Sequence, residues 1–345
     1  MEKTILSGLQ QKDFEDLTEK LNASKFRARQ IHNWIYLKSV SSIDEMTDLS
    51  KDFREELKNI AEVSNTKIKT KQISSDGTIK YLLEFPDGEC VETVLMRFDN
   101  RANLTACVSS QVGCAVNCAF CATGKRGFIR NLTPTEIIEQ VLTIQRDTGL
   151  KVSNIVFMGQ GEPLLNLENV LKAFDIFRDD FQISARRITI STSGIIPKIK
   201  ELADKKLQST LAISLHSAIS DIRKKIMPIE NKYSLSELKK ALKYYIEQTG
   251  RRITIEFLLI KDLTDTFEMA KQTALYLKDL KCNINLIPYN STDENEFKKP
   301  SGTSIMKFKA LLERSGKKVT IRLERGADID AACGQLSGKI KKWKH

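Results

Sequence analysis

Three closely spaced cysteines constrain this chain more than any other feature of its sequence. Cys114, Cys118 and Cys121 follow a C-x3-C-x2-C spacing, with Gly113 before them and Gly124 after them. A loop of this kind can turn all three thiols toward one centre, which indicates a metal ion or a metal cluster. Structural zinc takes four protein ligands, whereas a cubane 4Fe-4S cluster held by three thiolates keeps one iron free for a substrate. The spacing therefore predicts an iron–sulfur cluster with an open iron.

Length and cysteine usage limit the class of protein further. The 345 residues suffice for a barrel of about 250 residues with a small appended domain. Seven cysteines, an odd number with uneven spacing, argue against a disulfide framework and for thiols kept reduced. No apolar run is long enough to span a membrane, and the first residues do not resemble a signal peptide. We therefore expect a cytoplasmic protein without a membrane segment.

The chain is also strongly basic, with a formal net charge of +11. The surplus gathers in short clusters, among them Arg223–Lys225 and the C-terminal tail 339–345. One basic pair is most simply a solvated surface, and only the sum of these clusters is informative. That sum favours a polyanionic partner.

The first hundred residues change their periodicity once. Between residues 12 and 60, apolar residues recur at helical spacing, which predicts a small helical module. Between residues 66 and 98 the period becomes two and Asp-Gly turns intervene, which predicts a three-stranded meander. We assign residues 1–62 to an N-terminal helical domain, which either packs on the core or docks RNA, and residues 63–100 to a β extension.

Strands and helices alternate over residues 101–345, the third predicted domain. Thr133 and Glu136 form a capping box around Pro134, which marks the start of the first helix. This alternation predicts an α/β fold with a parallel sheet or barrel. The six predicted strands cover residues 104–109, 154–158, 187–192, 211–215, 253–259 and 283–287, and a further strand covers 319–323.

Residues suited to ligand binding follow five of these six strands. In β/α barrels the carboxyl ends of the strands form the active-site face, so these stretches are expected to meet around a ligand. They are the cysteine segment, Gly159–Pro163, Ser191–Gly194, Ser214–Ser217 and Pro288–Asn290.

Three residues on this face have both a structural and a functional interpretation. Gly161 and Glu162 fit a tight turn with a capping acid, or a site where backbone approaches a ligand and a carboxylate receives an ammonium group. A lone histidine such as His216 is more often structural, but its place among the other loops makes it a candidate ligand contact.

The remaining candidates lie away from that face. Cys90 and Cys282 are expected to be inert buried thiols, and Cys107 is equally well explained as buried or functional. Cys333 lies in a loop, where a thiol can be exposed and reactive. Glu92 lies in the last strand of the meander, and its position alone predicts a solvent-exposed carboxylate.

Six separate motifs together carry a family resemblance over nearly the whole chain. They are the cysteine segment with its approach at 107–123, Gly-Glu-Pro-Leu-Leu-Asn at 161–166, Ser-Thr-Ser-Gly-Ile-Ile-Pro at 191–197, Ile-Ser-Leu-His-Ser at 213–217, Ile-Asn-Leu-Ile-Pro-Tyr-Asn at 284–290 and Asp-Ile-Asp-Ala-Ala-Cys-Gly-Gln-Leu at 328–336. In these motifs the chain resembles the RlmN/Cfr family of radical S-adenosylmethionine (SAM) RNA methyltransferases. The resemblance implies a partial (β/α)6 barrel with a small N-terminal helical domain.

The resemblance also implies a role for each candidate residue. Cys114, Cys118 and Cys121 would hold a 4Fe-4S cluster. Gly161, Glu162, Ser191, Ser214, Leu215, His216 and Asn290 would bind SAM. Cys333 would carry the methyl group, Cys107 would resolve the intermediate, and Glu92 would accept a proton, which reverses the expectation from its strand position. Family members often carry methionine in place of Gln160, but the binding residues beside it are unchanged.

The substrate implied by the resemblance is carbon 2 of adenine in 23S rRNA and tRNA. Each turnover would use two molecules of SAM, a methyl-cysteine intermediate and a transient disulfide, together with an external electron donor and a thiol reductant. The protein would act as a monomer.

Two alternatives remain at this point. The antibiotic-resistance branch of the same family methylates carbon 8 of adenine with the same cysteine pair, but it typically differs at Gly-Glu-Pro-Leu-Leu-Asn and Ser-Gln-Val-Gly-Cys. A non-catalytic RNA module could instead bind zinc through the three cysteines and either His216 or Cys107.

Overall fold

One mixed sheet of ten strands forms the centre of the molecule. The computed structural model describes residues 3–98, 101–290 and 296–337, so the basic tail 339–345 lies outside the described residues. The order of the strands is β14-β13-β12-β11-β10-β9-β6-β5-β4-β3. The antiparallel members are β3 (Lys67–Ile73), β4 (Ile79–Glu84) and β5 (Cys90–Phe98). The parallel members are β6 (Arg101–Cys107), β9 (Asn154–Phe157), β10 (Ile188–Thr192), β11 (Thr210–Ser214), β12 (Ile253–Leu259), β13 (Cys282–Pro288) and β14 (Lys318–Ile321).

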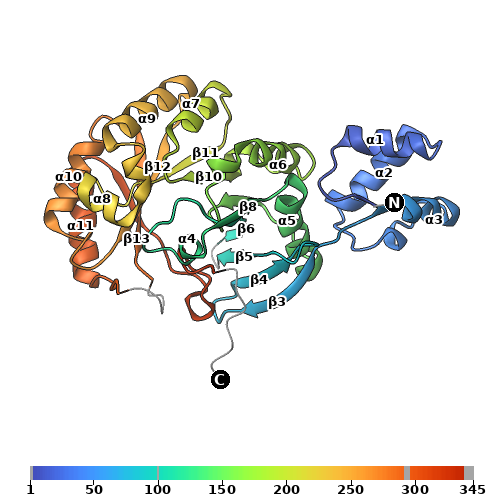
Figure 1. The fold of residues 1–345 in the computed structure, drawn as a ribbon, viewed down its shortest axis with the longest axis horizontal. Helices are drawn as coiled ribbons and strands as arrows, with labels where there is room; N and C mark the ends of the chain where they lie inside the picture. Colours follow the sequence, from blue (N-terminus) through green and yellow to red (C-terminus); the bar gives the residue numbers. More distant parts are fainter. Residues whose placement is uncertain (1–2, 99–100, 291–295, 338–345) are drawn as a thin grey trace.

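The strand-and-helix alternation produces the predicted partial barrel. Each crossover from one parallel strand to the next carries helices, and Figure 1 shows α7, α9, α10 and α11 along the outer side of the curved sheet. The helices are α5 (Pro134–Thr148), α6 (Leu167–Asp179), α7 (Ile196–Asp204), α8 (Ser220–Ile226), α9 (Leu235–Thr249), α10 (Phe267–Leu277) and α11 (Gly302–Arg314). The α/β class is confirmed, and the strand predicted at 319–323 joins the six others as β14.

Local capping determines where the first of these helices begins and ends. Thr133 Oγ1 accepts a hydrogen bond from the backbone N–H of Glu136 at 3.2 Å, and Glu136 Oε2 accepts one from the N–H of Thr133 at 2.8 Å. Gly149 ends the helix with a left-handed φ of 67°. The capping box predicted from sequence is therefore present.

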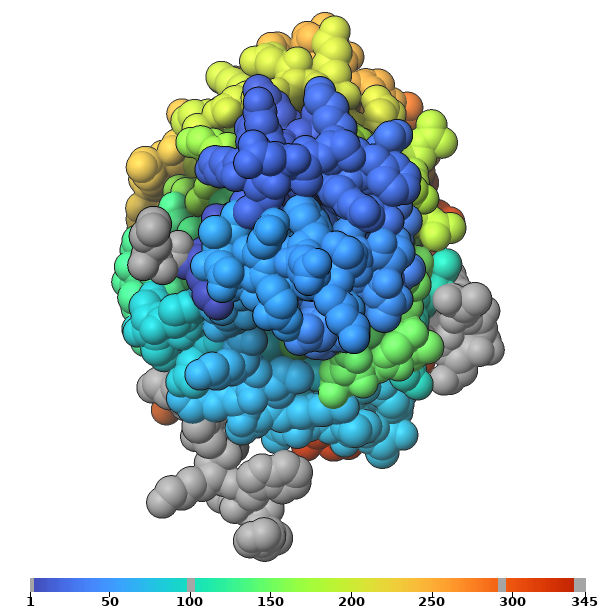
Figure 2. Space-filling model, turned by 90° about the vertical axis from the view of Figure 1, so that its right-hand side faces the viewer, coloured from blue at the N-terminus to red at the C-terminus, as the bar shows by residue number. Residues whose placement is uncertain are grey.

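The N-terminal module packs against one end of this core. It contains α1 (Gln11–Lys20), α2 (Lys25–Tyr36) and α3 (Lys51–Ile60), and Figure 2 shows the module covering that end. A two-stranded parallel pair, β1 (Thr4–Ile5) with β2 (Ala61–Glu62), closes the module and was not predicted. His32 Nε2 lies 2.6 Å from Asp180 Oδ1 at the end of α6 and helps to join the module to the core.

Two short strands lie at the ends of the cysteine segment, and short 3-10 helices lie at several turns of the chain. The antiparallel pair β7 (Gln111–Gly113) and β8 (Phe128–Asn131) was also not predicted, and it fixes both ends of the segment that contains α4 (Ala122–Arg126). The 3-10 helices are η1 (Ile43–Glu45), η2 (Pro163–Asn166), η3 (Ala185–Arg187), η4 (Pro228–Asn231) and η5 (Ala327–Ile329).

None of the helices in the described ranges is both long and apolar enough to cross a lipid bilayer.

A buried ion pair braces two of the strand-end loops. Arg223 and Glu230 are joined at 2.8 Å, with side chains 1% and 0% exposed. Arg223 also donates to the carbonyl oxygens of Leu215 at 3.1 Å and Ser193 at 2.7 Å. The guanidinium therefore connects the loops that follow β10 and β11.

We expect Glu230→Gln to destabilise the protein strongly. Breaking a buried pair leaves an uncompensated charge, so the free energy of unfolding should fall by about 3–5 kcal/mol. Glu168→Gln is the matched control, because it breaks an exposed pair with Lys172 at 2.9 Å and should cost no more than about 0.5 kcal/mol. Urea unfolding of both variants measures the difference, and equal small losses would contradict the role assigned to the buried pair.

Candidate active site

A cavity lies at the carboxyl ends of the parallel strands, where the sequence predicted a site. Its volume is about 170 Å³. The predicted residues that line it are Cys114, Cys118, Cys121, Gly161, Glu162, Ser191, Ser214, His216 and Cys333. The loops that follow four parallel strands thus contribute to one wall of polar and sulfur-containing groups, as expected for this face of a β/α barrel.

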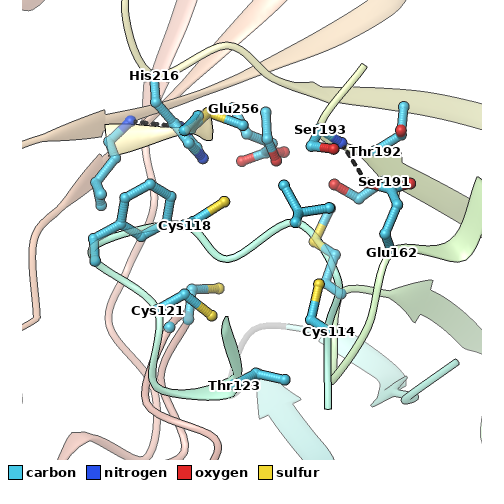
Figure 3. A pocket seen from close by; sticks show the side chains of 18 of the residues that line it. Cys114, Cys118, Cys121, Thr123, Glu162, Ser191, Thr192, Ser193, His216 and Glu256 are labelled. Carbon is cyan, nitrogen blue, oxygen red and sulfur yellow. Dashed lines mark hydrogen bonds between the residues drawn. The ribbon is translucent and has the colours of Figure 1, made fainter. Parts of the chain in front are cut away.

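The three cysteines of the motif surround a common space. Figure 3 shows the side chains of Cys114, Cys118 and Cys121 around it. The approach to Cys114 requires glycine at position 113, because Gly113 has φ +74° and a Cβ there would lie 1.8 Å from the carbonyl oxygen of Gly127. The close packing of this turn therefore fixes the position of Cys114, the first cysteine of the motif.

The chemistry of these thiols fits an iron–sulfur cluster. Burial raises the pKa of Cys114 to about 12, and it also raises the pKa of Cys118 and Cys121. Such thiols become thiolates when a metal centre binds them. Within the described ranges, no three His, Cys, Asp or Glu side chains converge as ligands of a single ion would. A cubane cluster places each thiolate on a separate iron, so it accepts this wider arrangement.

Gly161 and Glu162 form the turn after β9. Gly161 has φ +100°, and a Cβ would lie 2.7 Å from the backbone nitrogen of Gln111, so only glycine fits. Glu162 is 3% exposed, and burial raises its pKa. Its Oε2 accepts from the N–H of Ser193 at 2.7 Å and its Oε1 accepts from the N–H of Leu164 at 3.0 Å. The acid therefore caps the turn and also faces the cavity.

His216 is held as a neutral hydrogen-bond donor. Its Nδ1 accepts from the N–H of Leu258 at 3.1 Å, which leaves the ring proton on Nε2. Burial, followed by the nearby charge of Arg223, lowers its pKa to about 3. Phe120 packs edge-on against the imidazole with ring centroids 5.0 Å apart. The residue before the last cysteine of the motif thus helps to orient His216.

Leu215 and Asn290, which were also predicted to bind the ligand, do not line this cavity. The side chain of Leu215 is fully buried in the apolar core, and its N–H donates to the carbonyl oxygen of Glu256 at 3.1 Å. Asn290 lines a neighbouring cavity of about 360 Å³. Its buried Oδ1 has no hydrogen-bond partner among the residues that the structure describes, so it can accept from a ligand.

Cys333 lies between the two cavities. It lines the first together with the motif cysteines, and it lines the second together with Cys107. The N–H of Ala122 donates to the carbonyl oxygen of Gly334 at 2.8 Å, and Thr123 Oγ1 donates to that of Leu336 at 2.6 Å. These bonds hold the C-terminal loop at the edge of the cysteine segment, 213 residues away in sequence.

Cys107 is buried beside this loop. Its side chain is 7% exposed, and burial raises its pKa to about 12. The guanidinium of Arg322 lines both cavities and acts in the opposite direction, favouring the thiolate of Cys107. Cys90 and Cys282 are buried as predicted, and neither lines a cavity described here.

The expectation that Glu92 faces solvent is wrong. Glu92 is 3% exposed, and its Oε1 lies 3.1 Å from Lys80 Nζ. The reason is tertiary, because the side chain of Lys80 from the neighbouring strand β4 and the loop around Cys333 lie over this face of β5. Local sequence contained one signal of this burial, since Val94 and Met96 are apolar and share the face of Glu92.

Several polar residues in and around the site were not predicted from the sequence. Glu256 lines the first cavity and is 3% exposed, which raises its pKa, and it was visible as an acid inside an apolar strand. Nothing in the sequence around Arg322 or Lys80 distinguished either residue from a surface cation. Gln160, the residue that departs from the family pattern, is fully buried and accepts from the N–H of Glu92 at 3.0 Å.

Comparison with known proteins agrees with this geometry. Residues 108–277 match the model of the Radical SAM superfamily, and residues 4–63 match the model of the ribosomal RNA large subunit methyltransferase N-terminal domain. A crystal structure of a radical SAM methyltransferase from Sphaerobacter thermophilus has a TM-score of 0.92 and 38% identity, over 98% of this chain and 100% of that one. The fold and the cavity are those of a radical SAM enzyme.

Curated relatives narrow the class to one family. A probable dual-specificity RNA methyltransferase RlmN from Alkaliphilus oremlandii is 46% identical over 98% of this chain and 99% of the relative. A relative with the same description from Clostridioides difficile is 43% identical over 98% and 99%. The chain belongs to the RlmN family of radical SAM RNA methyltransferases. It is therefore an enzyme that uses a 4Fe-4S cluster and SAM and acts on RNA, and the alternative of a non-catalytic zinc-binding module is excluded.

The buried neutral histidine predicts a specific pH dependence of stability. Below pH 6.5 the unfolded chain protonates His216, whereas the folded protein does so only at about pH 3. Stability should therefore fall as the pH drops through this window, and His216 should contribute up to about 1.4 kcal/mol per pH unit. In His216→Gln the slope of unfolding free energy against pH should be shallower by that amount. Parallel slopes for the two proteins in urea titrations would contradict the buried neutral state.

Proposed function

We propose that this enzyme methylates carbon 2 of adenine in 23S rRNA and tRNA through a methyl group carried on Cys333. The observation that carries the proposal is the position of Cys333, whose side chain lines both the cavity of the motif cysteines and the cavity of Cys107. A sulfur in this place can meet SAM from one side and a base from the other. The choice of carbon 2 rests on the family resemblance.

Cys114, Cys118 and Cys121 would hold the cluster, and SAM would bind beside it. Gly161 allows close approach of backbone, Glu162 receives the ammonium group of the methionine moiety, and Ser191, Ser214 and the Nε2–H of His216 offer hydrogen bonds. Leu215 contributes through its backbone, and Asn290 through its Oδ1, which has no hydrogen-bond partner within the described part of the chain. When bound, the cluster and SAM supply one electron and a carbon-centred radical.

The substrate atom explains why a radical enzyme needs two further thiols. Carbon 2 of adenine lies between two ring nitrogens and is electron-poor, so it does not attack a sulfonium methyl group as an ordinary acceptor does. A protein sulfur must therefore receive the methyl group first, by displacement. A second SAM in each turnover would then serve to activate that methyl group.

The residues of the chain complete the reaction. Once the carbon on the Cys333 sulfur is bonded to carbon 2 of adenine, Glu92 removes the proton from carbon 2 as a general base, and the electron that the adduct must lose would return to the cluster. The thiolate of Cys107 then attacks the sulfur of Cys333 and breaks its bond to the transferred carbon, which takes up a proton as the methylated base leaves and a disulfide remains. The Cys107 thiol is protonated at rest, whereas this attack requires the thiolate. The positive charge of Arg322 favours that thiolate. An external thiol reduces the disulfide, and an external donor supplies the electron.

The RNA would be held by positive charge and presented with one base unstacked. A base that is modified within RNA must leave its stack to enter a pocket. The net charge of +11 predicts affinity that falls with salt. We propose that residues 1–62 dock the RNA, that residues 63–100 support the site, and that residues 101–345 form the catalytic core. The enzyme would act as a monomer in the cytoplasm.

The carbon-8 alternative predicts a different product. Unmodified 23S rRNA and tRNA fragments would be incubated with reduced enzyme and SAM under anaerobic conditions, and then digested to nucleosides. Chromatography with mass spectrometry against standards separates 2-methyladenosine from 8-methyladenosine. We expect the first, and 8-methyladenosine alone would reject our assignment.

The two catalytic cysteines should fail at different steps. Cys333→Ala should abolish turnover, because no sulfur carries the methyl group. Cys107→Ala should form a covalent protein–RNA conjugate, because resolution fails. Denaturing gels and mass spectrometry detect the conjugate. Cys90→Ala and Cys282→Ala are matched controls, since both remove buried cysteines outside the two cavities. A Cys107→Ala enzyme with wild-type turnover would refute its role.

Replacement of one motif cysteine should affect the metal directly. We expect wild-type protein purified without oxygen to be brown and to contain iron and sulfide. Cys118→Ala should lose most of the iron, because a cubane with two protein thiolates is poorly held. Cys90→Ala should retain it. Colourless wild-type protein that contains zinc and no iron would contradict the proposed ligands.

A further inference from the structure

The turn between β3 and β4 is hydrogen-bonded to the loop that precedes Cys333. The N–H of Gly326 donates to Asp76 Oδ2 at 3.0 Å, and Ser74 Oγ donates to Asp328 Oδ1 at 2.5 Å. Packing is close here, because a Cβ on Gly326, which has φ +63°, would lie 2.9 Å from the side chain of Thr78. The meander is therefore attached to the C-terminal loop by side chains of both segments.

Lys80 extends this attachment to Glu92. It lies on β4, and its side chain is 9% exposed. Its Nζ lies 3.1 Å from Glu92 Oε1 and donates to the carbonyl oxygen of Asp330 at 3.2 Å. Asp330 precedes Cys333 by three residues, so one ammonium group contacts both the proposed proton acceptor and the loop of the proposed methyl carrier.

Strand register explains how Lys80 reaches Glu92. Lys80 pairs with Val94 on β5, and Glu92 is two residues from Val94, so all three share one face of the sheet. Diagonal neighbours of this kind are within reach of a long side chain. Val94 and Met96 of the same face line the second cavity. The carboxylate of Glu92 thus belongs to the face on which that cavity is built.

The backbone of Glu92 is held from the opposite direction. Gln160 Oε1 accepts from its N–H at 3.0 Å, and Ser109 Oγ donates to its carbonyl oxygen at 2.7 Å. These bonds fix the main chain and leave the position of the carboxylate to its side-chain contacts, among which is Lys80. A buried lysine is costly to desolvate and adds little net stability compared with an apolar residue, so its bridging geometry is its more informative property.

We propose that Lys80 is a positioning residue that holds the carboxylate of Glu92 and the loop of Cys333 in one register for proton removal from the base. The inference rests on the proposed function, because it takes Glu92 as the proton acceptor and Cys333 as the methyl carrier. A general base must lie within hydrogen-bond reach of the proton it removes. A misplacement of 1 Å can cost about a hundredfold in rate.

The test compares Lys80→Met, Lys80→Arg and a matched control, Lys69→Met. Lys69 forms a partly exposed ion pair with Glu84 in the same meander and contacts neither cavity. Three quantities are measured on the full-length enzyme: methylation of Cys333 by peptide mass spectrometry, turnover of RNA, and the amount of covalent protein–RNA conjugate. Hydrogen–deuterium exchange of residues 326–336 is measured without RNA or SAM.

In Lys80→Met, methylation of Cys333 should stay within about twofold of wild type, because the bonds from Ala122 and Thr123 still hold the loop. Turnover should fall by about 10- to 100-fold, and the conjugate should accumulate because the proton is not removed. Exchange of residues 326–336 should rise. Lys80→Arg should recover most of the turnover, because a guanidinium can also bridge a carboxylate and a carbonyl. Lys69→Met should match wild type.

Wild-type turnover in Lys80→Met would overturn the inference. So would a parallel loss of Cys333 methylation, turnover and melting temperature without rescue by arginine, since that pattern marks a residue needed only for folding. If wild-type protein never carries a methyl group on Cys333, the proposed function fails. In that case hydrogen exchange still tests whether Lys80 holds the loop of Cys333. Unchanged protection of residues 326–336 in Lys80→Met would refute that contact.

Discussion

The attachment of the C-terminal loop to the cysteine segment is the contact on which the site depends. Two hydrogen bonds, from Ala122 and Thr123 to Gly334 and Leu336, join parts of the chain that are more than 200 residues apart. They bring the thiol of Cys333 to the wall of the cavity formed at the strand ends. Every other strand-end loop contributes to that cavity through the ordinary geometry of a parallel sheet.

Much of the architecture could be predicted because its causes are local. The capping box at Thr133 and Glu136, the change of period near residue 66 and the alternation after residue 101 each depend on neighbouring residues. The strand-end rule then predicted which loops meet, and Ser191, Ser214 and His216 do line one cavity. Closely spaced cysteines are informative for the same reason, since their spacing limits where their thiols can point.

The rest depends on contacts between distant segments and could not be derived from local patterns. Glu92 is buried because the side chain of Lys80 and the loop around Cys333 lie over its face of the sheet, and both belong to other segments of the chain. Lys80 and Arg322 look like surface cations in the sequence, yet Arg322 lines the cavity and Lys80 is buried against Glu92. The family resemblance indicated the importance of Glu92, whereas the contacts that hold it became visible only in the fold.

The wall shared by the two cavities has a kinetic consequence. If Cys333 carries the methyl group as proposed, its sulfur must react first with SAM and then with the base, although it lines both cavities. Nucleic acid that arrives before the sulfur is loaded would occupy a dead-end complex, and nucleic acid that arrives afterwards would find a charged carrier. Compulsory order of addition would thus arise from the chemistry of one shared sulfur, without a hinge or a closing lid.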